Sequence, residues 1–155
     1  MIDVAALYLR HGALVLRRAR RLLSDEEGAR DVVHDVFISL HERRHTLQDT
    51  GMISWLYVVT TNLCLKRLRT AATWARLARS LDPPWQAPVR GEDLAAIRSA
   101  LATLPEELAT VAVYRFVDEM THAEIAALIG CSRRHVGDLL NRFERAIEPA
   151  RKVLP

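Results

Sequence analysis

The chain has 155 residues, of which 50% are hydrophobic and 26% are charged. This composition supports a buried core and excludes an intrinsically disordered tail. No apolar run approaches the length of a transmembrane helix, and the first residues do not have the pattern of a signal peptide. The two cysteines, Cys64 and Cys131, are too few for a disulfide framework or a zinc site. We therefore expect a cytoplasmic protein that needs no cofactor and no metal.

The formal net charge is only +3, but 20 of the 22 basic residues are arginine. Arginine is the better bidentate partner for phosphate and for guanine, although an arginine-rich codon usage would give the same excess. The charge is also uneven along the chain. Residues 133–152 carry six basic and three acidic side chains, whereas residues 95–132 carry two and five. This pattern predicts a local anion-binding surface near the C-terminal end.

Helical periodicity runs through most of the N-terminal half. Apolar residues at helical spacing predict a first helix over 4–22, and Ser24 with Glu27 predicts a capping box that opens a second helix. Residues 48–51 form a loop, and helical spacing resumes at Trp55. Residues 57–61 have the composition of a strand, but a single strand would lack a partner, so we expect helix there as well.

Three prolines and a glycine between residues 82 and 91 exclude a helix across that segment. We therefore place a linker at 73–94, between domains at 1–72 and 95–155. Helical spacing returns after the linker. The predicted fold class is all-α, with two small helical domains, each only modestly stable alone.

Residues 121–136 have the pattern of a helix-turn-helix. Thr121 and Glu124 predict a capping box, Gly130 stands where the turn needs a left-handed residue, and Ser132 precedes the second helix as its cap. Val136 would anchor that helix to the core. An ordinary helical hairpin is the alternative interpretation.

In a helix-turn-helix the second helix enters the major groove of DNA. Its outward side chains are then candidates for contacts to base edges and phosphates, although a solvated surface is the alternative for any single one. The candidates are Ser132, Arg133, Arg134, His135, Asp138, Asn141, Arg142 and Arg145.

Both halves together resemble an extracytoplasmic-function (group IV) sigma factor of the sigma-70 family. The segment 7–69, through the stretches 31–37 and 61–69, resembles region 2 of that family, and the segment 100–147 resembles region 4. The resemblance implies a sigma factor that directs promoter-specific initiation, with region 2 melting the −10 element and region 4 contacting the −35 element. The implied −10 residues are Asn62, Lys66, Arg67 and Arg69, and the implied contacts to core polymerase are Asp31, His34, Asp35 and Phe37.

The resemblance also implies the partners: promoter DNA, the β′ clamp helices and β flap of core RNA polymerase, and an anti-sigma factor. We expect a monomer when free and no membrane insertion. The chain departs from the family pattern at Gly28 and Arg30, where acidic residues are usual, and at Gly137 and Leu139, where basic residues are usual. These departures keep a sigma-like protein with weak initiation activity as an alternative.

A stand-alone helix-turn-helix regulator is the second alternative, and the region 2-like half argues against it. An enzyme is not expected, because the sequence has no Gly-rich phosphate loop and no nucleophile–base pair. The histidines at positions 41 and 45 have a metal-compatible spacing but lack further ligands nearby.

Overall fold

A computed structural model describes residues 1–81 and 92–151, and it describes side chains for residues 1–73 and 98–149. Every regular element in these ranges is helical, as the sequence predicted. Contacts divide the chain into an N-terminal unit, Met1–Arg67, and a C-terminal unit, Leu68–Pro155. None of the helices described combines the length and the apolar character that a membrane span requires.

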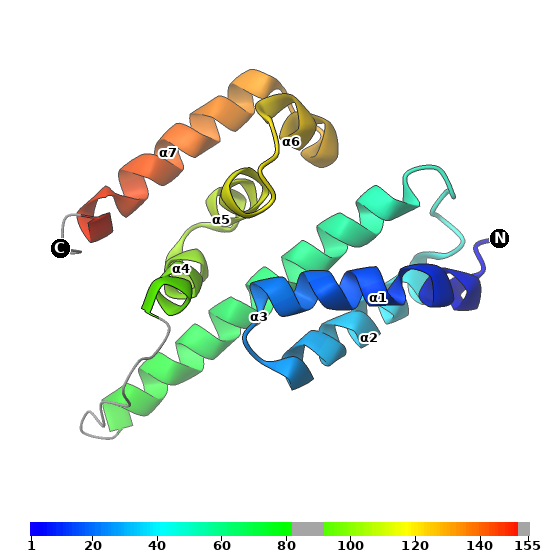
Figure 1. The fold of residues 1–155 in the computed structure, drawn as a ribbon, viewed down its shortest axis with the longest axis horizontal. Coiled ribbons are helices and arrows are strands. Elements are labelled where there is room, and N and C mark those ends of the chain that lie inside the picture. Colours follow the sequence, from blue (N-terminus) through cyan, green and yellow to red (C-terminus); the bar gives the residue numbers. More distant parts are fainter. Residues whose placement is uncertain (82–91, 152–155) are drawn as a thin grey trace. The chain divides into compact units, whose positions relative to one another are not determined.

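The N-terminal unit is built from α1 (Val4–Leu22), α2 (Glu26–Arg43) and the first half of α3 (Met52–Leu81) (Figure 1). A three-residue connection joins α1 to α2, and these helices pack against each other. The core consists of apolar side chains at helical spacing, which are Leu7, Val15, Ala19 and Leu22 of α1, Val32, Val36 and Leu40 of α2, and Leu56, Cys64 and Leu65 of α3.

A buried arginine joins α1 to α3 inside this unit. The Arg18 side chain is 8% exposed, its Nη2 donates to Oγ1 of Thr61 at 3.1 Å, and its guanidinium lies 4.1 Å from the ring centroid of Tyr57. The strand-like run around Tyr57 is helical, as expected. Its threonine hydroxyls donate to carbonyls one turn back, Thr60 to Leu56 at 2.6 Å and Thr61 to Tyr57 at 2.9 Å.

Two local expectations need correction. The cap of α2 is Asp25, not Ser24: its carboxylate accepts from the amides of Glu27 and Gly28. The linker expected at 73–94 is helical up to Leu81 and again from Glu92, and residues 82–91 of that linker lie outside the described residues.

The C-terminal unit contains α4 (Glu92–Thr103), α5 (Glu106–Ala112), a π-helical turn η1 (Val113–Val117), α6 (His122–Ile129) and α7 (Arg133–Arg151). Helices α5 and α6 both pack on α7. The π turn follows α5 directly, and the amide of Asp118 donates to the carbonyl of Val113 at 3.1 Å. The chain then turns through Glu119, whose φ is +55°, before α6 begins. Fully buried side chains from these elements include Val111, Val113, Tyr114, Ile125 and Val136.

Candidate nucleic-acid and polymerase interfaces

The helix-turn-helix forms as the sequence predicted. Oγ1 of Thr121 accepts from the Glu124 amide at 3.2 Å, and the Glu124 carboxylate accepts from the Thr121 amide at 2.7 Å. The hydrogen bond that the carboxylate receives from the Thr121 amide, with a smaller contribution from the Thr121 side chain, lowers the pKa of Glu124. Gly130 ends α6 with φ +74°, and Oγ of Ser132 accepts from the His135 amide at 3.1 Å to start α7. The turn between α6 and α7 is therefore fixed by local hydrogen bonds at both helix ends.

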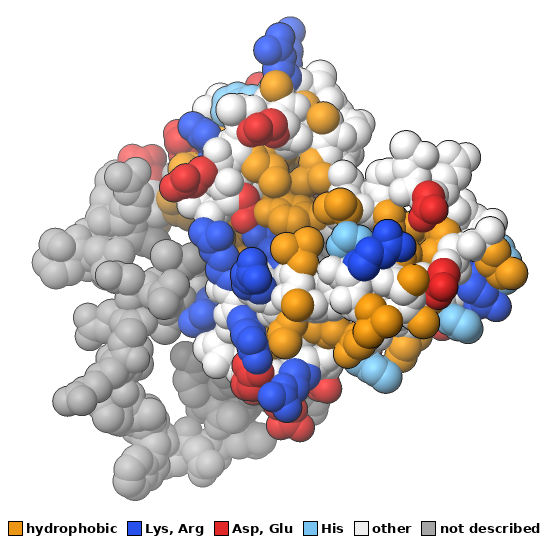
Figure 2. All heavy atoms as spheres, turned by 45° about the vertical axis from the view of Figure 1, so that its right-hand side comes forward, with side chains coloured by type: hydrophobic (Ala, Val, Ile, Leu, Met, Phe, Trp, Pro, Cys, Tyr) orange, Lys and Arg blue, Asp and Glu red, His pale blue; other side chains and the backbone are white. Residues whose placement is uncertain are grey.

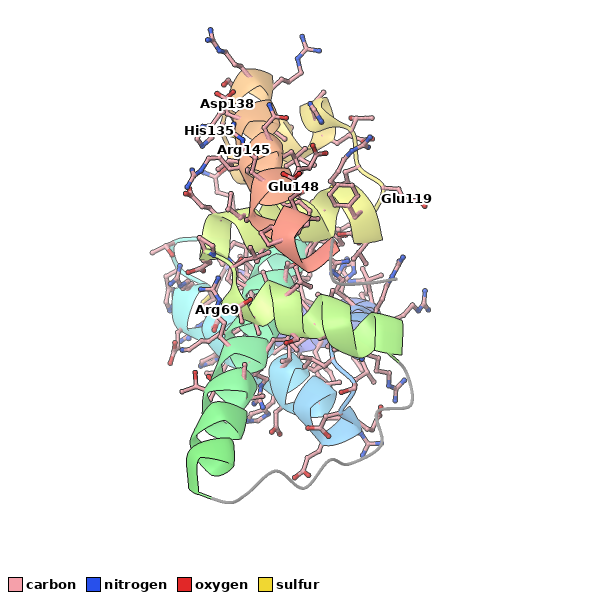
Figure 3. The ribbon with its side chains drawn as sticks, turned by 90° about the vertical axis from the view of Figure 1, so that its left-hand side faces the viewer. Arg69, Glu119, His135, Asp138, Arg145 and Glu148 are labelled. Atoms are coloured by element: carbon pink, nitrogen blue, oxygen red, sulfur yellow. The ribbon has the colours of Figure 1, made fainter. Side chains whose placement is uncertain are left out.

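The structure brings the predicted recognition residues together on α7. Val136, Leu139 and Leu140 face the core. Seven of the candidates lie on the remaining surface of the helix, and Ser132 directly precedes it. All eight of them are exposed: Ser132, Arg133, Arg134, His135, Asp138, Asn141, Arg142 and Arg145. Figure 3 shows His135, Asp138 and Arg145 along this helix. Arg142 also forms an ion pair with Glu107 of α5, at 3.2 Å between Nη1 and Oε1.

A second surface of the C-terminal unit is aromatic. Phe116 of η1 is 56% exposed, and its ring centroid lies 5.5 Å from that of Phe143 on α7. Phe143 follows the inward side of α7, between Leu140 and Ile147, so this pair lies away from the exposed recognition residues. The sequence pattern gives no signal for this surface, because Phe116 stands at the same helical spacing as the buried Leu108 and Ala112 before it.

The predicted −10 residues do not form one surface. Asn62 and Lys66 are exposed and lie one turn apart on α3, and the half-buried Trp55 lies two turns before Asn62. Arg67 is directed toward α2 instead, where its Nη2 lies 3.4 Å from Oδ2 of Asp31 and 3.6 Å from Oδ2 of Asp35.

Arg69 belongs to the C-terminal unit, and its guanidinium is engaged there (Figure 3). Nη2 donates to the carbonyl of Leu104 at 2.9 Å, and Nη1 lies 3.8 Å from Oε2 of Glu106. The family resemblance implied a contact to the −10 element at this position. The observed hydrogen bond gives Arg69 a role in holding the connection between α4 and α5.

The predicted polymerase-binding residues are only partly accessible. Asp31 and His34 are exposed and Asp35 is half-exposed on one side of α2, but Phe37 is 7% exposed and packs edge-on against Tyr8 at 5.0 Å between centroids. Phe37 therefore supports the helix from within the core of the N-terminal unit.

The exposed apolar residue on this side of α2 is Ile38, which is 43% exposed and lies two turns after Asp31. The seven-residue spacing from Asp31 is the sequence signal that would have identified it. The accessible side of α2 thus combines two carboxylates and a histidine with one exposed apolar residue. On the face of the molecule drawn in Figure 2, exposed hydrophobic side chains likewise lie beside charged ones.

Within the described residues, no group of three or more His, Cys, Asp or Glu side chains is arranged to hold a metal ion. Burial raises the pKa of the Cys64 thiol to about 12, against the opposing effects of Arg18 and Arg67. A thiol held in this way is unreactive at neutral pH.

Comparisons with known proteins agree with this geometry. Residues 7–80 match the family described as Sigma-70 region 2, and residues 94–146 match Sigma-70, region 4. The sigma factor SigM of Mycobacterium tuberculosis is 28% identical over 142 residues, covering 90% of this chain and 71% of that protein. SigW of Bacillus subtilis is 26% identical over 151 residues, covering 86% and 79%.

Among solved structures, the sigma factor RpoE of Bartonella quintana, in complex with the anti-sigma factor NepR, has the same fold. The TM-score is 0.54 at 16% identity, over 97% of this chain and 98% of that one. Two family matches in the same order as the two units, together with curated relatives along most of the length, establish the assignment. The chain belongs to the sigma-70 family, as an extracytoplasmic-function sigma factor of RNA polymerase.

Proposed function

We propose that the two units divide promoter recognition, with the N-terminal unit binding core polymerase and the melted −10 element and the C-terminal unit binding the −35 duplex. The observation that carries this proposal is the exposed recognition surface of α7, which a capped turn presents in the manner of a helix-turn-helix. In this role the chain is an initiation factor that acts through binding to polymerase and to promoter DNA.

For the −10 element, the accessible side of α3 supplies the contacts. Asn62 and Lys66 lie on one face and Trp55 is half-exposed near them along the same helix. A melted strand needs cations for its backbone and aromatic rings for its unstacked bases, and this face offers both kinds of group. Arg67 joins this set once its carboxylate partners are taken by another molecule.

For core polymerase, the accessible side of α2 supplies the contact through Asp31, His34, Asp35 and Ile38. A mixed acidic and apolar surface suits a partner whose helices present basic and apolar side chains. The aromatic pair Phe116 and Phe143 gives the C-terminal unit a second protein-binding surface, which we assign to the β flap.

An anti-sigma factor is the proposed regulator. The solved relative from Bartonella quintana is bound to the anti-sigma factor NepR, and in this chain the exposed faces of α2 and α7 are the surfaces that such a partner would cover. The site of action is the bacterial cytoplasm, where the polymerase works.

The test is run-off transcription with purified core polymerase, the full chain and genomic promoter fragments. Specific transcripts that require both proteins support the proposal. Specific protection of DNA by the chain alone, with no transcript when polymerase is added, would contradict it and would favour a stand-alone regulator. Replacing Asn62 and Lys66 with alanine should abolish promoter opening while leaving the −35 footprint in place.

A further inference from the structure

Asp138 occupies the middle of the exposed recognition face. Arg134, Asp138, Asn141 and Arg145 follow one another at spacings of four, three and four residues, which places them in one stripe along α7. Because the buried side chains of this helix face the other way, the stripe is directed to solvent. Figure 3 shows Asp138 near the start of the helix, the part that reaches base edges in a helix-turn-helix.

Within the described residues, the Asp138 carboxylate forms no hydrogen bond and no ion pair. Arginines stand one turn away on either side, but Arg142 is directed to Glu107 at 3.2 Å. A carboxylate at the centre of a phosphate-binding face weakens DNA binding at every sequence unless the groove supplies a donor for it. Arg134 and Arg145, at the two ends of the stripe, offset the repulsion, so that the Asp138 carboxylate can discriminate between bases.

The chemistry of the major groove limits that choice. An ionised carboxylate only accepts hydrogen bonds, and the donors in the groove are the N4 amino group of cytosine and the N6 amino group of adenine. Adenine places the N7 acceptor beside N6, where it would face the second carboxylate oxygen, whereas cytosine has no acceptor beside N4. We infer that Asp138 is a specificity-determining residue that accepts a hydrogen bond from N4 of one cytosine in the −35 element.

This inference rests on the proposed function, in which α7 enters the −35 major groove. The experiment uses holoenzyme assembled from the full chain and core polymerase, and a promoter library randomised across the −35 element. Bound promoters are sequenced for the wild-type chain and for Asp138→Ala, Asp138→Asn and Glu144→Gln. Glu144 is the matched control, because it is exposed on the same helix and lies six residues from Asp138, outside the stripe.

We expect the wild-type holoenzyme to prefer cytosine at one −35 position by about fivefold or more. Asp138→Ala should remove that preference and leave the other positions unchanged. Asp138→Asn should move the preference to adenine, since an amide pairs with both N6 and N7. Glu144→Gln should leave every preference as it is.

Uniformly tighter binding by Asp138→Ala, with unchanged base preferences, would overturn the inference, because Asp138 would then act only as a repulsive charge. A wild-type preference for adenine that Asp138→Ala removes would overturn the assignment to cytosine. Both of these outcomes leave the proposed −35 contact intact. A wild-type holoenzyme with no base preference anywhere in the −35 element would contradict the proposed function and this inference together.

Discussion

Nη2 of Arg67, on α3, lies 3.4 Å from Oδ2 of Asp31, on α2. Asp35 shares the same guanidinium at 3.6 Å. A residue predicted to contact DNA is thus paired with two residues predicted to contact polymerase. A partner that binds the carboxylates releases Arg67, and a phosphate that binds Arg67 releases the carboxylates. If both proposed contacts form, the two binding events are linked, and by the same factor in both directions.

The first prediction concerns this ion-pair cluster. Replacing Asp31 and Asp35 with asparagine should weaken binding to core polymerase by about tenfold or more, because the contact loses two charges. Stability should change by no more than about 1 kcal/mol, since all three side chains are substantially exposed. Titration of labelled core polymerase and urea unfolding measure the two effects.

Glu26→Gln is the control for this cluster. Glu26 of α2 also forms surface ion pairs, with Arg20 of α1 and with Arg30 of its own helix. It lies on a different side of α2 from Asp31. The Glu26→Gln variant should bind polymerase as tightly as the wild type does. Equal losses of polymerase affinity in the control and in the double variant would show that the effect comes from overall charge.

The second prediction concerns the capping box of α6. Thr121→Ala should lower the free energy of unfolding of the C-terminal unit by about 1 kcal/mol. Thr103→Ala is the control, because that hydroxyl donates to a carbonyl within its own helix and caps nothing. Hydrogen exchange of the α6 amides reports the change locally.

The Glu124 carboxylate adds a pH dependence. Its pKa is lowered in the folded chain, so its stabilisation is present above the unfolded value of about 4.3 and is lost as the pH falls through the lowered folded value. Glu124→Gln should remove this contribution to the acid transition. An unchanged transition in the glutamine variant would be evidence against the hydrogen bond.

The third prediction concerns Gly137 in the recognition helix. A Cβ built at this position meets nothing within 4 Å, and its backbone is helical. Gly137→Ala should therefore raise the free energy of unfolding by up to about 1 kcal/mol. Ala146→Gly, at an exposed site on the same helix, should lower it by a similar amount. Destabilisation by Gly137→Ala would mean that the glycine is required by its surroundings.

The fourth prediction concerns the two cysteines. Cys64 is fully buried with a pKa of about 12, whereas Cys131 is half-exposed at the turn of the helix-turn-helix. A thiol reagent at pH 8 should modify Cys131 quickly and Cys64 only after unfolding. Cys131→Ser should abolish the fast phase in the native protein. Fast modification of two thiols per folded wild-type chain would contradict the buried position of Cys64.

Sequence reasoning succeeded where the determinants are local. The helix-turn-helix depends on Thr121, Glu124, Gly130 and Ser132 at fixed offsets, and every one of them has the predicted role. The cap of α2 was assigned to the wrong neighbour, because Ser24 and Asp25 are both good caps. Gly28 favours Asp25, since a Cβ there would lie 2.8 Å from the Asp25 carboxylate and disturb the cap.

The errors at Arg67 and Arg69 arise because the outcome depends on distant partners. Arg67 and Asp31 are 36 positions apart, and Arg69 and Leu104 are 35 apart, so their pairing has no periodic signal. Phe37 belongs to the apolar stripe of its own helix, and its burial followed from that periodicity. The family resemblance placed it on the surface, and the packing against Tyr8 corrects this.

The stripe on α7 has a consequence for how new promoter preferences arise. Val136, Leu139 and Leu140 hold the helix, while Arg134, Asp138 and Asn141 are exposed and have little influence on folding. Mutations at these exposed positions can therefore accumulate with almost no loss of stability. A duplicated copy of this gene could acquire a different regulon through a few substitutions on one side of a single helix, and its fold would be inherited unchanged.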